Sequence, residues 1–155
     1  MENVYRSSRN KFTDLITIKN HSDYHSFLLC EALDRYKVYR SAEGLPLGRI
    51  LAVCANIREA ITLKQYSFDE ILLTGLTEPS AELVEEIRKD SRISYCQENS
   101  ECLRIPSKSY DLVICKEGIH HLARPYLGVY EMLRVSKSGV IFIEPGSTLI
   151  GSLLE

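Results

Sequence analysis

Short apolar runs alternate with stretches of helical spacing along most of this chain. The runs rich in β-branched residues have the length and composition of strands buried on both faces of a sheet, and they lie at 49–55, 70–76, 92–96, 110–115 and 139–143. Between them, apolar residues recur at every third or fourth position, as in helices that cover a sheet. The alternation predicts an α/β fold, a doubly wound Rossmann-like sheet of five mainly parallel strands.

Residues that start or stop helices mark the segments between these runs. We expect a helix over 22–39 that begins at Ser22-Asp23, one over 57–66, and one that begins at Pro125 and ends near 137–139. Between the second and third strands, Thr77 is expected to cap a helix with Pro79 in its first turn. Its inward-facing residues are then Ala81, Val84 and Ile87.

The Gly- and Pro-containing segment 41–48 reads as a linker. It divides the chain into an N-terminal arm and helix, 1–48, and an α/β domain, 49–155. The arm either docks on the domain or stays weakly ordered.

Composition describes an ordinary globular domain and excludes two classes of partner. The chain has 155 residues, 45% of them hydrophobic and 26% charged, with a net charge of −2, enough for one domain with a core. A charge so close to zero gives no basic face for nucleic acid. No apolar run is long enough for a membrane span, and the N-terminus lacks the apolar core of a signal peptide. We therefore expect a cytoplasmic location.

The chain contains five cysteines, an odd number, and four of them lie in or beside apolar runs. They are Cys30, Cys54, Cys96, Cys102 and Cys115. Buried, reduced thiols explain this pattern better than a disulfide framework.

The stretch from Ser100 to Pro145 contains SYDLVICKEGIHHL followed by EMLRVSKSGVIFIEP. This text resembles the second half of the class I S-adenosylmethionine-dependent methyltransferases, particularly the small-molecule, type 11 group that includes the quinone-biosynthesis enzymes. The resemblance implies a strand order of 3-2-1-4-5, S-adenosylmethionine as cofactor and a small-molecule substrate.

The family adds an antiparallel hairpin after the fifth strand, whereas only residues 144–155 follow here. The resemblance therefore predicts an uncovered edge on the fifth strand, which exposes unpaired backbone donors and acceptors. A second copy of the chain, a partner protein or the N-terminal arm would cover it, unless the sequence is a fragment of a longer protein.

The positions at which the family binds its cofactor hold unusual residues here. In place of the family's acid and glycines after the first strand stand Ala52, Cys54, Asn56 and Arg58, of which Asn56 alone tolerates a left-handed backbone. The ribose-binding acid after the second strand corresponds to Gly75, and Asn99 replaces the acid that contacts adenine.

The loss of the ribose-binding acid has the largest expected effect. Two hydrogen bonds to a carboxylate, at about 1.5–3 kcal/mol each, amount to roughly 10²–10⁴ in affinity. We therefore expect a degenerate relative with weak or no cofactor binding. The alternatives are an active methyltransferase with an atypical site and a non-catalytic scaffold that pairs through its open sheet edge.

Further candidate residues follow the fourth and fifth strands. By the resemblance, His120 or His121 lines the pocket as a proton acceptor or substrate contact; the alternative is a packing role. Glu144 and Glu117 either flank the pocket or act as caps. Lys116 either contacts an acidic ligand or lies exposed. His21 and His25 have zinc-compatible spacing but no third ligand, so no metal is predicted.

Overall fold

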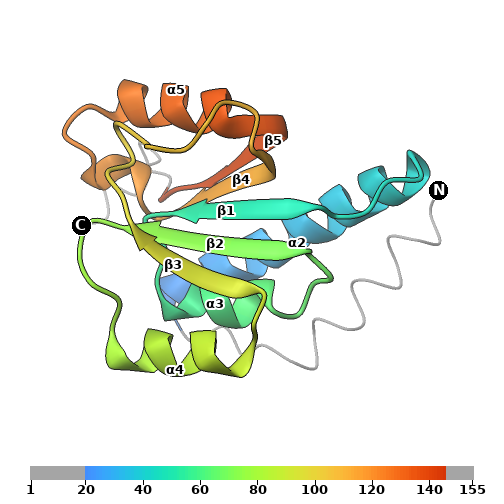
Figure 1. The fold of residues 1–155 in the computed structure, drawn as a ribbon, viewed down its shortest axis with the longest axis horizontal. Coiled ribbons are helices and arrows are strands. Elements are labelled where there is room, and N and C mark those ends of the chain that lie inside the picture. Colours follow the sequence, from blue (N-terminus) through green and yellow to red (C-terminus); the bar gives the residue numbers. More distant parts are fainter. Residues whose placement is uncertain (1–19, 146–155) are drawn as a thin grey trace, which may run out of the picture.

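The computed structural model describes residues 20–145, which fold around one central sheet (Figure 1). Its strands are β1 (Arg49–Val53), β2 (Glu70–Gly75), β3 (Ile93–Gln97), β4 (Tyr110–Lys116) and β5 (Ser136–Ile143). Their order is β3-β2-β1-β4-β5, and every neighbouring pair is parallel. The predicted fold class and strand order are confirmed.

Helices cover both faces of the sheet. They are α2 (His21–Ala42), α3 (Ile57–Leu63), α4 (Ala81–Lys89), the short 3-10 helix η1 (Ile119–His121) and α5 (Pro125–Val135). In Figure 1, α5 lies on one side of the sheet and α3 and α4 lie on the other. Because β1 and β4 are sandwiched between these layers, they read as continuous apolar runs.

Alternate residues of the strands point their side chains toward the two opposite helical layers. Ile50 and Ala52 of β1 belong to one apolar cluster, with Leu29 and Leu33 of α2. Leu51 and Val53 belong to a second cluster on the other face, with Met132 and Val135 of α5. The period-two alternation of β-strand side chains thus builds two cores on one sheet.

Several helix boundaries differ from the prediction. Helix α2 is capped by Asn20 and runs to Ala42, three residues beyond its predicted end at 39 and into the predicted linker. Helix α3 ends at Leu63, three residues early, with Lys64 as its C-cap. Helix α4 is capped by Ser80, whose side chain accepts a hydrogen bond from the Leu83 N–H, so Thr77 is not the cap. As a result Leu83, rather than Ala81, is the fully buried residue of this helix.

The α5–β5 junction has no loop, whereas the prediction placed the helix end near 137–139. The helix ends at Val135 and the strand begins at Ser136. The Ser136 hydroxyl donates to the Gly139 carbonyl (2.7 Å) and accepts from the Gly139 N–H (2.9 Å). The Ser136 side chain thus pairs with the N–H and the carbonyl of Gly139, which would otherwise be available to continue the helix.

The prediction of reduced cysteines is confirmed, since all five are free. The prediction that they are buried holds for Cys30 and Cys115 but is wrong for Cys96 and Cys102, which are exposed on β3 and on the loop after it. An edge strand leaves one side of each residue open, which sequence pattern alone does not show. None of the helices over residues 20–145 has the length and apolar character needed to cross a bilayer.

Candidate functional site

The turn after β1 reverses the chain in three residues. Cys54 has a φ of 54°, the left-handed conformation that normally favours glycine. Asn56 is instead extended (φ −135°) and caps α3 by accepting the Arg58 N–H at 2.8 Å. The interpretation that Asn56 alone of these residues tolerates a left-handed backbone is therefore wrong, because Cys54 adopts that conformation and Asn56 does not. Glu59 completes the cap by accepting the Asn56 N–H at 2.8 Å.

The next two predicted cofactor positions leave little surface for a ligand. The Ala52 side chain is 0% exposed within the core of β1. At the end of β2, a Cβ atom on Gly75 would lie 2.6 Å from the Tyr95 hydroxyl oxygen. That hydroxyl donates to the Thr77 carbonyl at 2.6 Å, which holds the ring over Gly75. A larger side chain at position 75 therefore requires Tyr95 to move.

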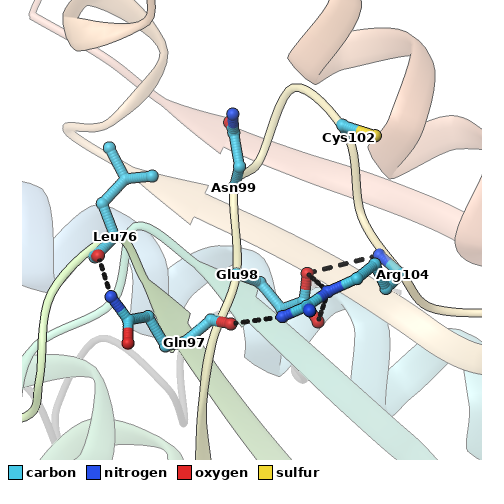
Figure 2. Close-up of a pocket in the computed structure, with 6 residues that line it drawn as sticks. All are labelled: Leu76, Gln97, Glu98, Asn99, Cys102 and Arg104. Carbon is cyan, nitrogen blue, oxygen red and sulfur yellow. Dashed lines mark hydrogen bonds and ion pairs between the residues drawn. The ribbon is translucent and has the colours of Figure 1, made fainter.

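An open hollow of about 340 Å³ lies beyond the carboxyl ends of β2 and β3 (Figure 2). Its lining residues are Leu76, Gln97, Glu98, Asn99, Cys102 and Arg104. Glu98 is buried and paired with Arg104 (Nε–Oε1 3.3 Å). The Asn99 side chain points away from this pair (Figure 2) and accepts the Glu101 N–H at 2.9 Å. Of the predicted cofactor contacts, Asn99 alone lines this hollow.

A buried ion pair lies at the carboxyl end of β4. Lys116 continues the inward face of Leu112 and Ile114, and its side chain is only 2% exposed. The ammonium lies 3.1 Å from Glu59 Oε1, itself 2% exposed, and 2.9 Å from Glu117 Oε2. The prediction that Lys116 is exposed is wrong, because two carboxylates from separate elements neutralise it inside the protein.

The first turns of helix α2 form polar contacts with residues at the same end of the sheet. His25, buried on α2, has its Nδ1 2.8 Å from Glu117 Oε1. Asp23 pairs with Arg58 at the start of α3 (3.0 Å). Burial alone would raise the pKa of Glu117, but hydrogen bonds from Lys116 and His25 outweigh it and lower that pKa to about 2. Glu117 therefore serves as an ionised bridge between α2 and β4.

The predicted catalytic residues do come together. His120 Nδ1 lies 2.5 Å from Glu144 Oε2, and the rings of His120 and His121 are 4.0 Å apart. The other Glu144 oxygen accepts the N–H groups of Gly118 (2.9 Å) and Ile119 (2.8 Å), and so holds the 3-10 turn. Burial would raise the pKa of Glu144, but the His120 and backbone hydrogen bonds lower it.

This arrangement can orient an imidazole for proton transfer, because a carboxylate fixes the ring through one nitrogen and leaves the other nitrogen to act. Both histidine side chains are exposed at the carboxyl end of β4. The dyad is therefore open to a ligand from solvent, whereas Lys116 is not.

Two residues of this region, Glu59 and Tyr95, were not predicted from the sequence, and His25 was considered only for its spacing with His21. The N-x-x-E spacing of Asn56 and Glu59 is a capping-box signal that was available in the sequence. The positions of Tyr95 over Gly75 and of His25 against Glu117 depend on tertiary packing and left no local signal. Among residues 20–145, no three His, Cys, Asp or Glu side chains form a group that could hold a metal ion.

Comparison with known proteins supplies the family. A family model described as "Methyltransferase domain" matches residues 54–143. No curated protein matches the chain. Solved structures match well, although the chain spans about half the length of the first of them (46%, 45% and 44%).

Three of these structures illustrate the range of similarity. The PH0226 protein from Pyrococcus horikoshii OT3 is 17% identical with a TM-score of 0.62, and the match covers 96% of this chain and 66% of that one. A candidate methyltransferase from Bacillus halodurans C-125 is 19% identical with a TM-score of 0.55, covering 65% and 46%. A third match, at 17% identity and a TM-score of 0.51, comes from a complex between the Haloferax volcanii Trm112 methyltransferase activator and a candidate methyltransferase, covering 63% and 44%.

Proposed function

Because this chain belongs to the methyltransferase-domain family, we propose that it is a degenerate member, which keeps the class I fold but binds S-adenosylmethionine weakly or not at all. Membership of the family leads us to expect that S-adenosylmethionine binds. The residues at the carboxyl ends of β1 and β2 argue against that binding.

The observation that carries this proposal is the end of β2. By the resemblance, an acid there would bind both ribose hydroxyls, but the position is Gly75 and the Tyr95 hydroxyl fills its side-chain space at 2.6 Å. A ribose in the family position would find no carboxylate and would contact the Tyr95 ring. The loss of two charge-assisted hydrogen bonds accounts for roughly 10²–10⁴ in affinity.

The turn after β1 also supports the proposal. Ala52, in place of the family's acid, is fully buried. Cys54 carries a side chain at a left-handed position where the family has glycine, and Asn56 is committed to capping α3. The close backbone approach that glycines give to a cofactor is reduced here.

A binding titration with radiolabelled S-adenosylmethionine tests the proposal. The natural chain should show no saturation up to about millimolar concentration, which corresponds to about −4 kcal/mol. Saturable binding at low micromolar concentration would contradict it.

Two variants make the test sharper. Gly75→Asp combined with Tyr95→Ala restores both a carboxylate and the room for it, and should bind more tightly than the natural chain. Gly75→Asp alone is the matched control, because Tyr95 still blocks the position. Circular dichroism would verify that both variants fold.

An active methyltransferase with an atypical site is the second candidate, and the His120–Glu144 dyad favours it. In this reading His120, with His121 and Glu144, removes the substrate proton. The cofactor would contact the backbone or side chains of Cys54, Asn56 and Asn99. Lys116 and Ala52, which are buried, would pack behind these residues. Methyl transfer to a small-molecule panel that is abolished by His120→Ala would support it.

A scaffold role remains the third candidate, with β5 as the pairing edge. Within residues 20–145 no strand pairs with the outer side of β5, and a second copy or a partner protein would supply the missing backbone hydrogen bonds. One neighbour comes from a complex with a methyltransferase activator, which supports the partner protein as the occupant without indicating which surface it uses. A strictly monomeric protein at high concentration by light scattering would oppose a homodimer.

The free thiols suit a cytoplasmic location.

A further inference from the structure

Two cysteines meet beneath the turn that follows β1. Cys54 follows Val53, whose Cα pairs with that of Cys115 on the neighbouring strand β4. A Cβ atom on Gly118 would lie 2.6 Å from the Cys115 Sγ and 3.1 Å from the Cys54 Sγ. Both thiols therefore point to one small space, which the absence of a side chain at Gly118 leaves open for them.

We propose that Cys54 and Cys115 form a redox-active thiol pair, in which Cys54 reacts with a peroxide and Cys115 then closes a reversible disulfide. The pair is distinct from the proposed cofactor chemistry and would react whether or not S-adenosylmethionine binds.

The strand geometry permits the bond. Neighbouring strands lie about 4.8 Å apart and one residue advances about 3.3 Å, so Cα atoms one step out of register are about 6 Å apart. Disulfides join Cα atoms about 4.4–6.8 Å apart. The left-handed backbone of Cys54 turns its side chain toward Cys115 and Ser100 rather than along the strand.

The surroundings assign different roles to the two thiols. Cys115 is 1% exposed, whereas Cys54 is only partly buried and is thus the thiol that an oxidant can reach. A hydrogen bond from Cys115 lowers the pKa of Cys54 to about 7, against the effect of burial and with help from the Ser100 hydroxyl. The hydrogen bond to Cys54 and burial raise the pKa of Cys115. Cys54 is therefore the attacking thiolate and Cys115 the resolving thiol.

The chemistry balances with hydrogen peroxide as the oxidant. The Cys54 thiolate attacks one peroxide oxygen, the O–O bond breaks, and hydroxide leaves to give a sulfenic acid on Cys54. The Cys115 sulfur then attacks the Cys54 sulfur, the S–O bond breaks, and water leaves with the Cys115 proton. The two thiols lose two electrons in total, and the peroxide is reduced to water.

Trypsin makes this bond directly measurable, because the two cysteines fall in separate short peptides. Cleavage after Arg49 and Arg58 gives ILAVCANIR, and cleavage after Lys108 and Lys116 gives SYDLVICK. After brief treatment of the native protein with hydrogen peroxide and alkylation of the remaining thiols, mass spectrometry should find these peptides joined. Dithiothreitol should separate them again.

Cysteine variants identify the attacking residue. Because Cys115 is buried and reacts through Cys54, Cys54→Ser should lower the oxidation of Cys115 by about tenfold or more. Cys96→Ser, which removes an exposed thiol on β3, is the matched control and should leave the ILAVCANIR–SYDLVICK link unchanged.

The natural chain alone can overturn the proposal, so the folding of a variant does not decide the test. The proposal fails if Cys96 and Cys102 are oxidised while the two peptides stay separate. It also fails if Cys54 links mainly to another cysteine.

Discussion

Replacement of Lys116 by methionine should destabilise this protein strongly. The change removes the charge and keeps an unbranched side chain that is one atom shorter, so most of its effect on the contact is electrostatic. In the natural chain the ammonium lies 3.1 Å from Glu59 and 2.9 Å from Glu117, and the Lys116 and Glu59 side chains are each 2% exposed.

The magnitude follows from the burial of Glu59. Without Lys116, the Glu59 carboxylate has no ammonium beside it and almost no contact with water. Breaking a buried pair in this way costs about 3–5 kcal/mol, a large part of the roughly 5–15 kcal/mol that stabilises an ordinary domain. Glu117 contributes less to the penalty because its side chain is 26% exposed and water can solvate it.

A second substitution tests this reasoning. Glu59→Gln in the Lys116→Met background removes the stranded charge but keeps an oxygen that can accept the Asn56 N–H. The double variant should recover about 2 kcal/mol or more of the loss. Urea unfolding followed by circular dichroism gives both values, provided that the slope m is unchanged.

Lys64→Met is the matched control, because Lys64 is 35% exposed and pairs with Glu86 near the surface. Its cost should be about 0–1 kcal/mol. If Lys116→Met costs no more than this control, or if the double variant is no more stable than Lys116→Met, Glu59 is not stranded as a buried charge when Lys116 is replaced.

Two further predictions concern neighbouring residues. Glu117, with its pKa lowered from 4.5 to about 2, stabilises the fold fully above pH 4.5, and this stabilisation is lost as the pH falls from 4.5 toward 2. Glu117→Gln should therefore lower the urea midpoint at pH 7. It should also make the urea midpoint depend less steeply on pH between 4.5 and 2; the same pH dependence as in the natural chain would contradict the role given to Glu117. Gly118→Ala should cost about 1–3 kcal/mol, because its Cβ would lie 2.6 Å from the Cys54 Cβ. Gly139→Ala is the control, because a Cβ atom on Gly139 would have no heavy atom within 4 Å, and its stability should change little. Equal losses of stability in the two variants would show that the contact with Cys54 is not the cause.

The sequence predicted the sheet well because its signals are local. A strand buried on both faces must be apolar along its length, as β1 and β4 are, and the order of such strands follows from the family text. The clustering of His120 with Glu144 was also predictable, because both residues follow neighbouring strands at the same end of the sheet.

The sequence did not predict the environment of individual polar residues. Lys116 reads as a surface residue unless Glu59 is known to lie beneath it, and those two positions are far apart in the chain. The left-handed turn falls on Cys54, a residue type with no preference for it, because the turn is fixed by β1 and the cap of α3. Long-range pairing decided both cases, and local propensity carries no information about it.

The direct passage from α5 into β5 restricts how the outer edge of the sheet can move. Val135 of the helix is followed directly by Ser136 of the strand, and the register against β4 shifts by one residue between Ser136 and Gly139, so β5 can slide along β4 only by moving the helix or by changing this irregularity. A slide that moved the helix would lift Met132 and Val135 out of the core they fill. A strand arriving from another molecule would therefore meet an edge whose position is set by α5, and its own side-chain pattern would choose the alignment.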